Sequence, residues 1–141
     1  MLSEVKDTWR MRWLASINEL TSIELQRRSW LDRANTNPHW SFVEFFCCYF
    51  DDLTLNYNYD EQLKSGLVSE QEFEIIKEWH EALDKYEAPD KNDTDHVAVL
   101  NDAKWLEIVQ VGVIARTALS LVLNEKERLI LNKETEGQTD D

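Results

Sequence analysis

Residues 68–83 have the sequence VSEQEFEIIKEWHEAL, and this stretch decides the fold class. Ser69 followed three residues later by Glu72 is a capping box, in which each side chain accepts a hydrogen bond from the other residue's backbone amide. Val68 and Phe73 stand at the two positions of a hydrophobic staple. Apolar residues then recur every three or four positions, as one face of a helix requires, at Phe73, Ile76, Trp79 (or His80) and Leu83. The pattern predicts a helix that begins at Ser69 and ends before Pro89.

The N-terminal residues 3–33 also show a helical period. Apolar side chains step by four, four, four and three along one stripe, at Val5, Trp9, Trp13, Ile17 and Leu20. After Leu20 the stripe shifts, and Thr21 with Glu24 forms another capping-box pair. The stretch is therefore either one long, bent helix or two helices, the second running from about Thr21 to Ala34.

The middle of the chain holds its most apolar segment, residues 40–53. Asn37 can cap a helix there, and Pro38 fits the first helical position. A helix that is apolar almost all round is usually central in a fold. A β-strand is the alternative, because aromatic residues also favour strands. A short helix over residues 61–65, capped by Asp60 and ended by Gly66, is expected next.

The last helical segment is expected to follow the polar loop 87–95 and to run from His96 or Asp102 to Asn132. Gly112 lies in its middle, where it costs about 1 kcal/mol against alanine and allows close packing against a neighbour. Residues 133–141 are expected to be a frayed acidic tail. Three glycines cannot supply the turns of a sheet-rich fold. We expect a single all-α domain over residues 1–132, a helical bundle of about five to six helices.

Acidic residues dominate the charged groups: 28 Asp and Glu against 15 Lys and Arg give a net charge of −13. Such a chain repels phosphate backbones and anionic lipid surfaces, so direct binding to nucleic acid or membrane is disfavoured. The charge either keeps the protein soluble or steers it to a basic partner. No signal peptide or membrane span is evident, and the adjacent Cys47 and Cys48 suit reduced core thiols. The expected location is the cytoplasm.

Motifs for catalysis or cofactor binding are not found in the sequence. His80 and Asp84 stand one helical turn apart, but a zinc site needs a third ligand and spacing suggests none. His39 lies about 12 Å from Cys47 along a helix, which is too far for proton transfer. The three glycines are scattered, so no phosphate-binding loop is present. The sequence predicts a non-enzymatic protein without metal or cofactor.

Tyrosine and acidic residues alternate along residues 51–61, and this stretch is the first candidate for partner binding. Aromatic rings anchor a partner while carboxylates steer a basic surface. The alternative is a loop whose tyrosines pack back on the core. The candidate contacts are Asp51, Asp52, Tyr57, Tyr59, Asp60 and Glu61, with Asp90, Asp93 and Asp95 as a second group.

Residues 30–38 (WLDRANTNP), then 42–45 (FVEF) and 48–53 (CYFDDL), resemble small bacterial immunity proteins of contact-dependent growth inhibition and other polymorphic toxin systems. Residues 66–69 (GLVS) and Trp105-Leu106 extend the resemblance over about residues 28–110. The resemblance implies a protein without catalysis that binds a cognate toxin domain, often a nuclease, in the cytoplasm and blocks it.

A structural or regulatory protein that forms homo-oligomers, for example a homodimer, is the alternative function. The segment from Leu119 to Leu131 is unusually apolar for a C-terminal element and is the expected interface in that case.

Overall fold

The computed structural model describes residues 3–31, 41–55 and 58–133, and within them every regular element is helical. The helices are α1 (Ser3–Leu20), α2 (Ile23–Leu31), α3 (Phe42–Phe50), α4 (Asp60–Ser65), α5 (Glu70–Lys85), α6 (His96–Leu100), α7 (Ala103–Ser120) and α8 (Glu125–Leu131), with a short 3₁₀ turn at Pro89–Lys91. The all-α prediction is confirmed, and the strand alternative for residues 40–53 is wrong because α3 occupies their centre.

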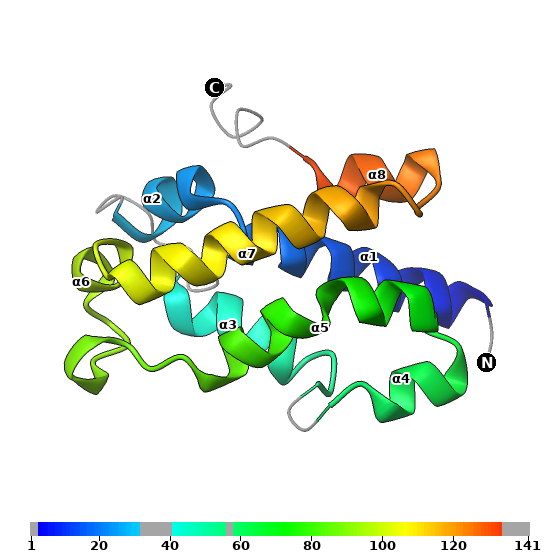
Figure 1. Ribbon diagram of the computed structural model, residues 1–141, viewed down its shortest axis with the longest axis horizontal. Helices are drawn as coiled ribbons and strands as arrows, with labels where there is room; N and C mark the ends of the chain where they lie inside the picture. Colours follow the sequence, from blue (N-terminus) through cyan, green and yellow to red (C-terminus); the bar gives the residue numbers. More distant parts are fainter. Residues whose placement is uncertain (1–2, 32–40, 56–57, 134–141) are drawn as a thin grey trace.

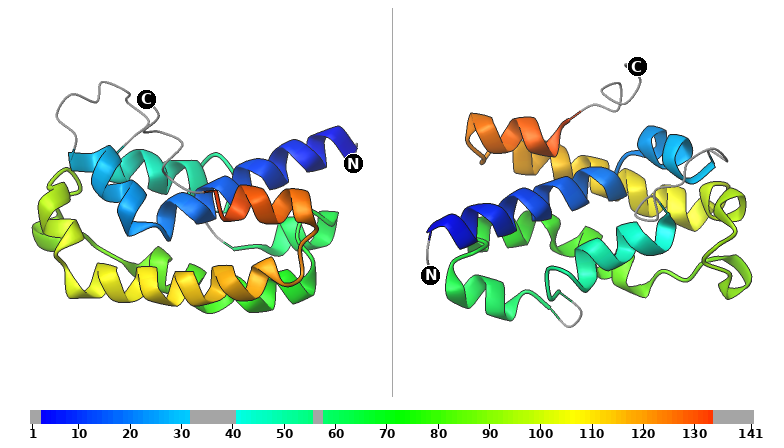
Figure 2. Two further views of the ribbon diagram at one scale, coloured as in Figure 1. Left: turned by 90° about the horizontal axis from the view of Figure 1, so that it is seen from above. Right: turned by 180° about the vertical axis from the view of Figure 1, so that it is seen from behind.

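The helices form two layers (Figures 1 and 2). α5 and α7 lie side by side in one layer, and α1 runs behind them with α3 and α8 against it. α2 and α6 pack together at one end of the long axis, whereas α4 lies at the other. The largest buried side chains, including Trp13, Trp79 and Trp105, all belong to one core between the layers.

Local capping signals explain where several helices begin and end. The Ser69–Glu72 capping box is present, so the start of α5 is confirmed. Gly66 ends α4 with a φ of 81°, a conformation that costs glycine least. α3 begins after Ser41, whose hydroxyl accepts from the amide of Glu44. The expected caps Asn37 and Pro38 lie outside the described residues.

The N-terminal stretch is two helices, and the predicted cap between them is wrong. Ser22 rather than Thr21 caps α2, because its hydroxyl accepts from the amide of Leu25 at 3.2 Å. The Thr21 hydroxyl is buried and donates back to the Ile17 carbonyl at 2.7 Å instead. α4 differs in a similar way: Asp60 is its first residue, and its N-cap is Tyr59.

Helices are more numerous than the sequence suggested because the last segment is three helices. Asp95, Asp102 and Asn124 each accept a hydrogen bond from a backbone amide two or three residues later and so start α6, α7 and α8. The described residues therefore hold eight α-helices instead of five or six. The expected tail from residue 134 onward lies outside the described residues.

Arg10 connects three parts of the bundle through a buried hydrogen-bond network. Its guanidinium donates to both carboxylate oxygens of Glu72 at 3.0 and 2.8 Å, and to the Leu67 carbonyl at 2.7 Å. It also donates to Glu127 of α8 at 2.7 Å. Burial alone would raise the pKa of Glu72, but the bonds from Arg10 and Ser69 hold it below its ordinary value. The network joins α1 to α5 and α8.

Glu19 is a partly buried carboxyl on α1, and none of the ion pairs among the described residues includes it. Burial raises the pKa of its carboxyl from 4.5 to about 7. When folding raises the pKa of a carboxyl, the stability of the native state falls as pH rises from the unfolded to the folded pKa, because the unfolded state ionises first. Stability from this group is therefore complete below about pH 4.5 and lost as pH rises through about 7.

Replacing Glu19 with glutamine is expected to stabilise the protein at high pH only. The gain is about 2–3 kcal/mol at pH 8 and close to zero at pH 4.5, since glutamine resembles the protonated acid. Urea unfolding of both proteins at several pH values measures it. If the difference in free energy of unfolding between the two proteins does not change with pH, the pKa of Glu19 is the same in the folded and the unfolded chain.

Candidate functional site

The structure places four of the nine predicted contact residues at the two ends of the connection between α3 and α4. Asp51 and Asp52 directly follow α3, Asp60 and Glu61 open α4, and all four are exposed. The connection is fixed by Gln62 of α4, whose amide donates to the carbonyls of Leu53 and Thr54 at 3.2 and 3.3 Å. We call Asp51, Asp52, Asp60 and Glu61 the acidic end.

The second predicted group, Asp90, Asp93 and Asp95, lies at the opposite end of the long axis (Figure 1). All three are exposed, but Asp95 has a structural role because it caps α6 through the amide of Ala98. Asp90 has a φ of 56° in the 3₁₀ turn. One compact partner domain cannot easily cover both groups, so the two ends are separate candidates.

Tyr59 is not a contact residue, and this prediction is wrong. Its side chain is only 1% exposed and lies in the core, where its ring packs near Phe73 and His80. Tyr57 lies outside the described residues. The alternative interpretation, in which a tyrosine of this loop packs back on the core, holds for Tyr59.

Tyr59 belongs to a buried chain of hydrogen bonds that the sequence did not reveal. Trp13 Nε1 donates to the Tyr59 hydroxyl at 2.9 Å, the Tyr59 and Tyr49 hydroxyls lie 2.5 Å apart, and Tyr49 lies 2.8 Å from His80 Nδ1. Every donor has an acceptor if the tyrosine protons point toward His80, which leaves Nδ1 as the acceptor and Nε2 protonated. Burial lowers the pKa of His80, and Asp84 and Glu81 offset part of this effect.

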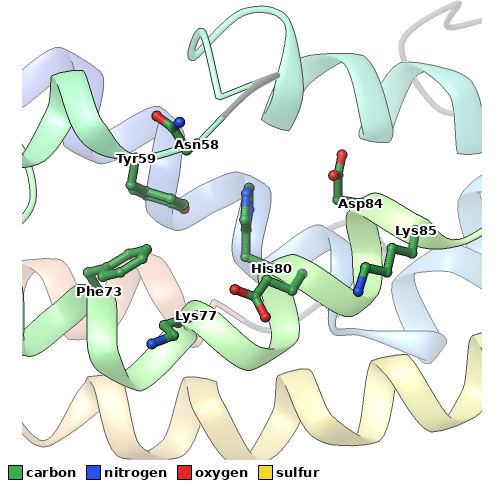
Figure 3. A pocket seen from close by; sticks show the side chains of 8 residues that line it. Asn58, Tyr59, Phe73, Lys77, His80, Asp84 and Lys85 are labelled. Carbon is green, nitrogen blue, oxygen red and sulfur yellow. The ribbon is translucent and has the colours of Figure 1, made fainter.

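A hollow of about 370 Å³ adjoins His80 between α5 and the connector before α4 (Figure 3). The imidazole stands between Tyr59 and Asp84, and Lys77 and Lys85 line the hollow from α5. Glu81 and Asp84 supply two carboxylates against these two ammonium groups. The charges therefore balance, so the hollow adds no negative potential to the acidic end. His80 is 7% exposed and belongs to the buried side of α5.

A second hollow, of about 390 Å³, opens at the acidic end and includes Asp52. Its apolar lining is Val5, Trp9 and Leu53, and Arg12 and Glu4 line it beside Asp52, so its charged residues are two acids and one arginine. Trp9 is half-buried and stacks on Trp13 at 5.7 Å between ring centroids. An exposed aromatic edge ringed by polar groups is typical of the centre of a protein interface. Sequence analysis missed Trp9, because its spacing marks it as one more core residue.

Asp51 and Asp52 stand where a helix favours positive charge. The C-terminal end of α3 carries the negative end of the helix dipole, and its last turn has no basic residue. Each acidic residue there costs about 0.3–1 kcal/mol at an exposed site. Hydrogen bonds from the Cys47 and Cys48 thiols to Asp51 and Asp52 offset part of this cost. The fold alone therefore gives little reason for two carboxylates at this position.

Both cysteine thiols are held in their protonated form. Burial, the first cause, and nearby carboxylates raise the pKa of Cys48 to about 11 and also raise that of Cys47, so both thiols stay protonated at neutral pH. Within residues 3–31, 41–55 and 58–133, no three metal-ligating side chains gather at one point. The helices described are also too short or too polar to cross a bilayer.

Comparison of the chain with protein-family models, with curated proteins and with solved structures finds no match.

Proposed function

We propose that the chain is a non-enzymatic binding protein of the cytoplasm, an immunity protein that neutralises a cognate toxin domain through the acidic end. The toxin is a basic protein, and a nuclease suits it best. A nuclease presents positive charge to its nucleic acid substrate, and an acidic protein competes for that surface. The resemblance of residues 28–110 to immunity proteins suggests the same role.

The observation that carries the proposal is the position of Asp51 and Asp52. Both carboxylates are exposed at a helix end that favours cations, and neither is in an ion pair among the described residues. Gln62 of α4 donates to the carbonyls of Leu53 and Thr54, which ties the start of α4 to the residues that follow Asp52. Charged residues that lower the stability of the fold are expected at positions where they bind a partner.

Trp9 gives the acidic end an apolar centre. Interfaces draw most of their affinity from a few aromatic side chains in a desolvated pocket, while charged residues at the rim steer the encounter. The hollow lined by Trp9, Leu53 and Asp52 is open to solvent, and a partner side chain that fills it would desolvate the Trp9 ring. An aliphatic or aromatic side chain of the toxin, flanked by lysines or arginines, would fit this arrangement.

The partner is identified by capture from the host that produces the chain. A tagged chain is purified at low salt, and the proteins that elute with it are identified by mass spectrometry. We expect one basic protein in stoichiometric amount, released as the salt concentration rises because screening weakens long-range attraction. A stoichiometric partner that is acidic, or whose binding does not respond to salt, would contradict an interface built on charge.

Removing three carboxylates from the acidic end is expected to weaken partner binding without weakening the fold. The triple variant Asp51→Asn, Asp52→Asn and Asp60→Asn loses three steering charges, and at about 0.5–1 kcal/mol each the affinity falls about tenfold to a hundredfold. The melting temperature stays close to that of the wild type. Removing negative charge from the C-terminal end of α3 stabilises that helix, and removing it from the N-terminal end of α4 destabilises that one by a similar amount.

The matched control removes the same number of charges from the opposite end. In Asp90→Asn, Asp93→Asn and Asp95→Asn, asparagine keeps the cap of α6 and tolerates the positive φ of residue 90. Calorimetric titration with the captured partner compares the two variants. If the control loses affinity and the first variant does not, the partner binds the second group of residues instead.

A further inference from the structure

The hollow beside His80 has an unpartnered polar atom of the core in its wall. His80 is 7% exposed and its Nδ1 is bonded to Tyr49, but its Nε2 has no hydrogen-bond partner within the described residues. Nε2 is not among the polar atoms that these residues seal from solvent without a partner, so a molecule in the hollow can reach it. A buried polar atom of this kind is a position where a ligand atom can complete the missing hydrogen bond.

The hydrogen-bond chain behind His80 decides what Nε2 can bind. The Trp13 indole can only donate, and it donates to the Tyr59 hydroxyl. The Tyr59 proton must then point to Tyr49, and the Tyr49 proton to Nδ1 of His80. A neutral imidazole that accepts at Nδ1 carries its proton on Nε2. Burial, the largest cause, lowers the pKa of His80, which favours the neutral ring. The hollow therefore contains a fixed N–H donor that needs an acceptor oxygen.

Charged side chains of both signs surround this donor. Glu81, Asp84 and Lys85 line the hollow, and none of the three is in an ion pair among the described residues. Lys77, the fourth, makes only a long contact of 4.0 Å within its own helix. Two ammonium groups and two carboxylates leave this wall without net charge, although the whole chain carries −13. A ligand with one positive and one negative group matches such a wall better than a net anion or a net cation.

Two aromatic rings supply the apolar part of the hollow. The ring centroids of Tyr59 and Phe73 lie 5.4 Å apart, and the Tyr59 ring stands edge-on to the His80 imidazole at 4.9 Å. Phe73 is half-buried, so part of its ring remains available for contact. The volume of about 370 Å³ is at the small end of ligand pockets, which hold about 300–1,000 Å³. The hollow therefore has room for one small molecule with an apolar group.

We propose that this hollow binds a free α-amino acid with an apolar side chain. The carboxylate of the ligand accepts from Nε2–H of His80, and its ammonium group donates to Asp84. These two residues are one turn apart, about 6 Å along the axis of α5, and an α-amino acid bridges this distance with a hydrogen bond of about 2.9 Å at each end. Figure 3 shows the aromatic rings and Asp84 on opposite sides of the imidazole, so the ligand side chain packs on Phe73. This site does not use the acidic end and is independent of the proposed function.

Calorimetric titration of the full chain with L-phenylalanine tests the ligand class. We expect a dissociation constant of roughly 0.1–1 mM, because the ligand is small and the hollow is open on one side. Phenylpropionate lacks the ammonium group and phenethylamine lacks the carboxylate, so each should bind about tenfold more weakly or worse. No binding of phenylalanine at about 20 mM, or equal binding of the three compounds, would overturn the inference.

Asp84→Asn tests the contact with the ammonium group. Phenylalanine binding should weaken about fivefold or more, whereas phenylpropionate binding should stay unchanged, because only the ammonium group contacts Asp84. Glu78→Gln is the matched control: it removes one charge from an exposed residue of α5 that does not line the hollow, and it should bind phenylalanine like the wild type. Equal losses in the two variants would overturn the contact with Asp84, since any acid on α5 would then have the same effect.

Nitrogen-15 NMR of the histidine rings tests the donor itself. In the free chain at neutral pH, Nε2 of His80 should carry the proton and Nδ1 should be the acceptor. Phenylalanine should then shift the Nε2 signal more than the Nδ1 signal, because only Nε2 contacts the ligand. A free chain in which Nδ1 carries the proton would contradict the proposal, since Nε2 would have no hydrogen to donate.

Discussion

Gly112→Ala is expected to lower the free energy of unfolding by about 2–4 kcal/mol, although alanine is the better helix former by about 1 kcal/mol. A Cβ at this position would lie 2.7 Å from Trp79 Nε1 and 2.9 Å from Trp79 Cδ1, and it would overlap the Thr21 methyl group. Trp79 is fully buried and α5 packs against α7 at this point, so neither the ring nor the helix has room to move. Overpacking therefore outweighs helix propensity.

Chemical denaturation of Gly112→Ala and of two companion variants measures this effect. Gly66→Ala is the control, because a Cβ there meets nothing within 4 Å and only the positive φ of 81° is strained. Its cost should stay near 1 kcal/mol. Thr21→Ser in the Gly112→Ala background removes the methyl group and should recover part of the loss. A Gly112→Ala protein as stable as the wild type would show that α7 does not approach Trp79 this closely.

Arg10→Met is expected to cost about 3–5 kcal/mol, because it leaves a buried carboxylate without its partner. Glu72 is 8% exposed, and the Arg10 guanidinium contacts both of its oxygens. The Leu67 carbonyl and Glu127 lose donors at the same time. The loss is much larger than an exposed ion pair would give, since water cannot replace the missing bonds.

A double-mutant cycle separates the ion pair from the packing of the arginine stem. Glu72→Gln in the Arg10→Met background removes the unpaired charge and should recover about half of the loss, while glutamine keeps its bond to the Ser69 amide. Denaturation at neutral pH gives all four free energies of unfolding. Additive costs in the two single variants would mean that Arg10 and Glu72 do not interact.

Much of the fold could be predicted because local signals decide it. The Ser69–Glu72 box, the Gly66 end of α4 and the close approach at Gly112 each depend on a few neighbouring residues or on one residue type. Asp102 and Asn124, both residue types that cap helices, also mark the places where the last segment divides into separate helices. Large apolar residues on the exposed side of α7, Leu106 and Ile114, made the segment look like one continuous apolar helix and hid those caps.

Tertiary partners of charged and aromatic residues could not be predicted. Among 28 acids the sequence marks Glu72 as a capping residue, but nothing in it shows that Glu72 and Glu127 bind Arg10. Tyr59 has the same local context as a surface tyrosine, and only the positions of Trp13 and Tyr49 show that it is buried. Trp9 follows the core stripe of α1, but the helix extends past the core at its N-terminal end, which leaves the ring partly exposed.

Tertiary packing also decides which residues are available for a homo-oligomer interface. The segment from Leu119 to Leu131 was expected to supply the interface, yet Leu119, Leu123 and Leu131 are buried in the core. Leu121, Val122 and Leu129 of this segment are exposed, as are Leu106 and Ile114 of α7. Periodicity over one helix cannot say which of two apolar sides faces the bundle.

Neutralisation in living cells tests the central claim most directly. The captured partner is expressed alone and together with the wild-type chain, the triple variant at the acidic end, or the matched triple variant at Asp90, Asp93 and Asp95, and growth is measured. We expect the partner alone to stop growth, and the wild type and the second variant to restore it, whereas Asp51→Asn, Asp52→Asn and Asp60→Asn restores it poorly at equal protein level. A bound partner that remains fully toxic beside the wild-type chain would contradict the proposed function.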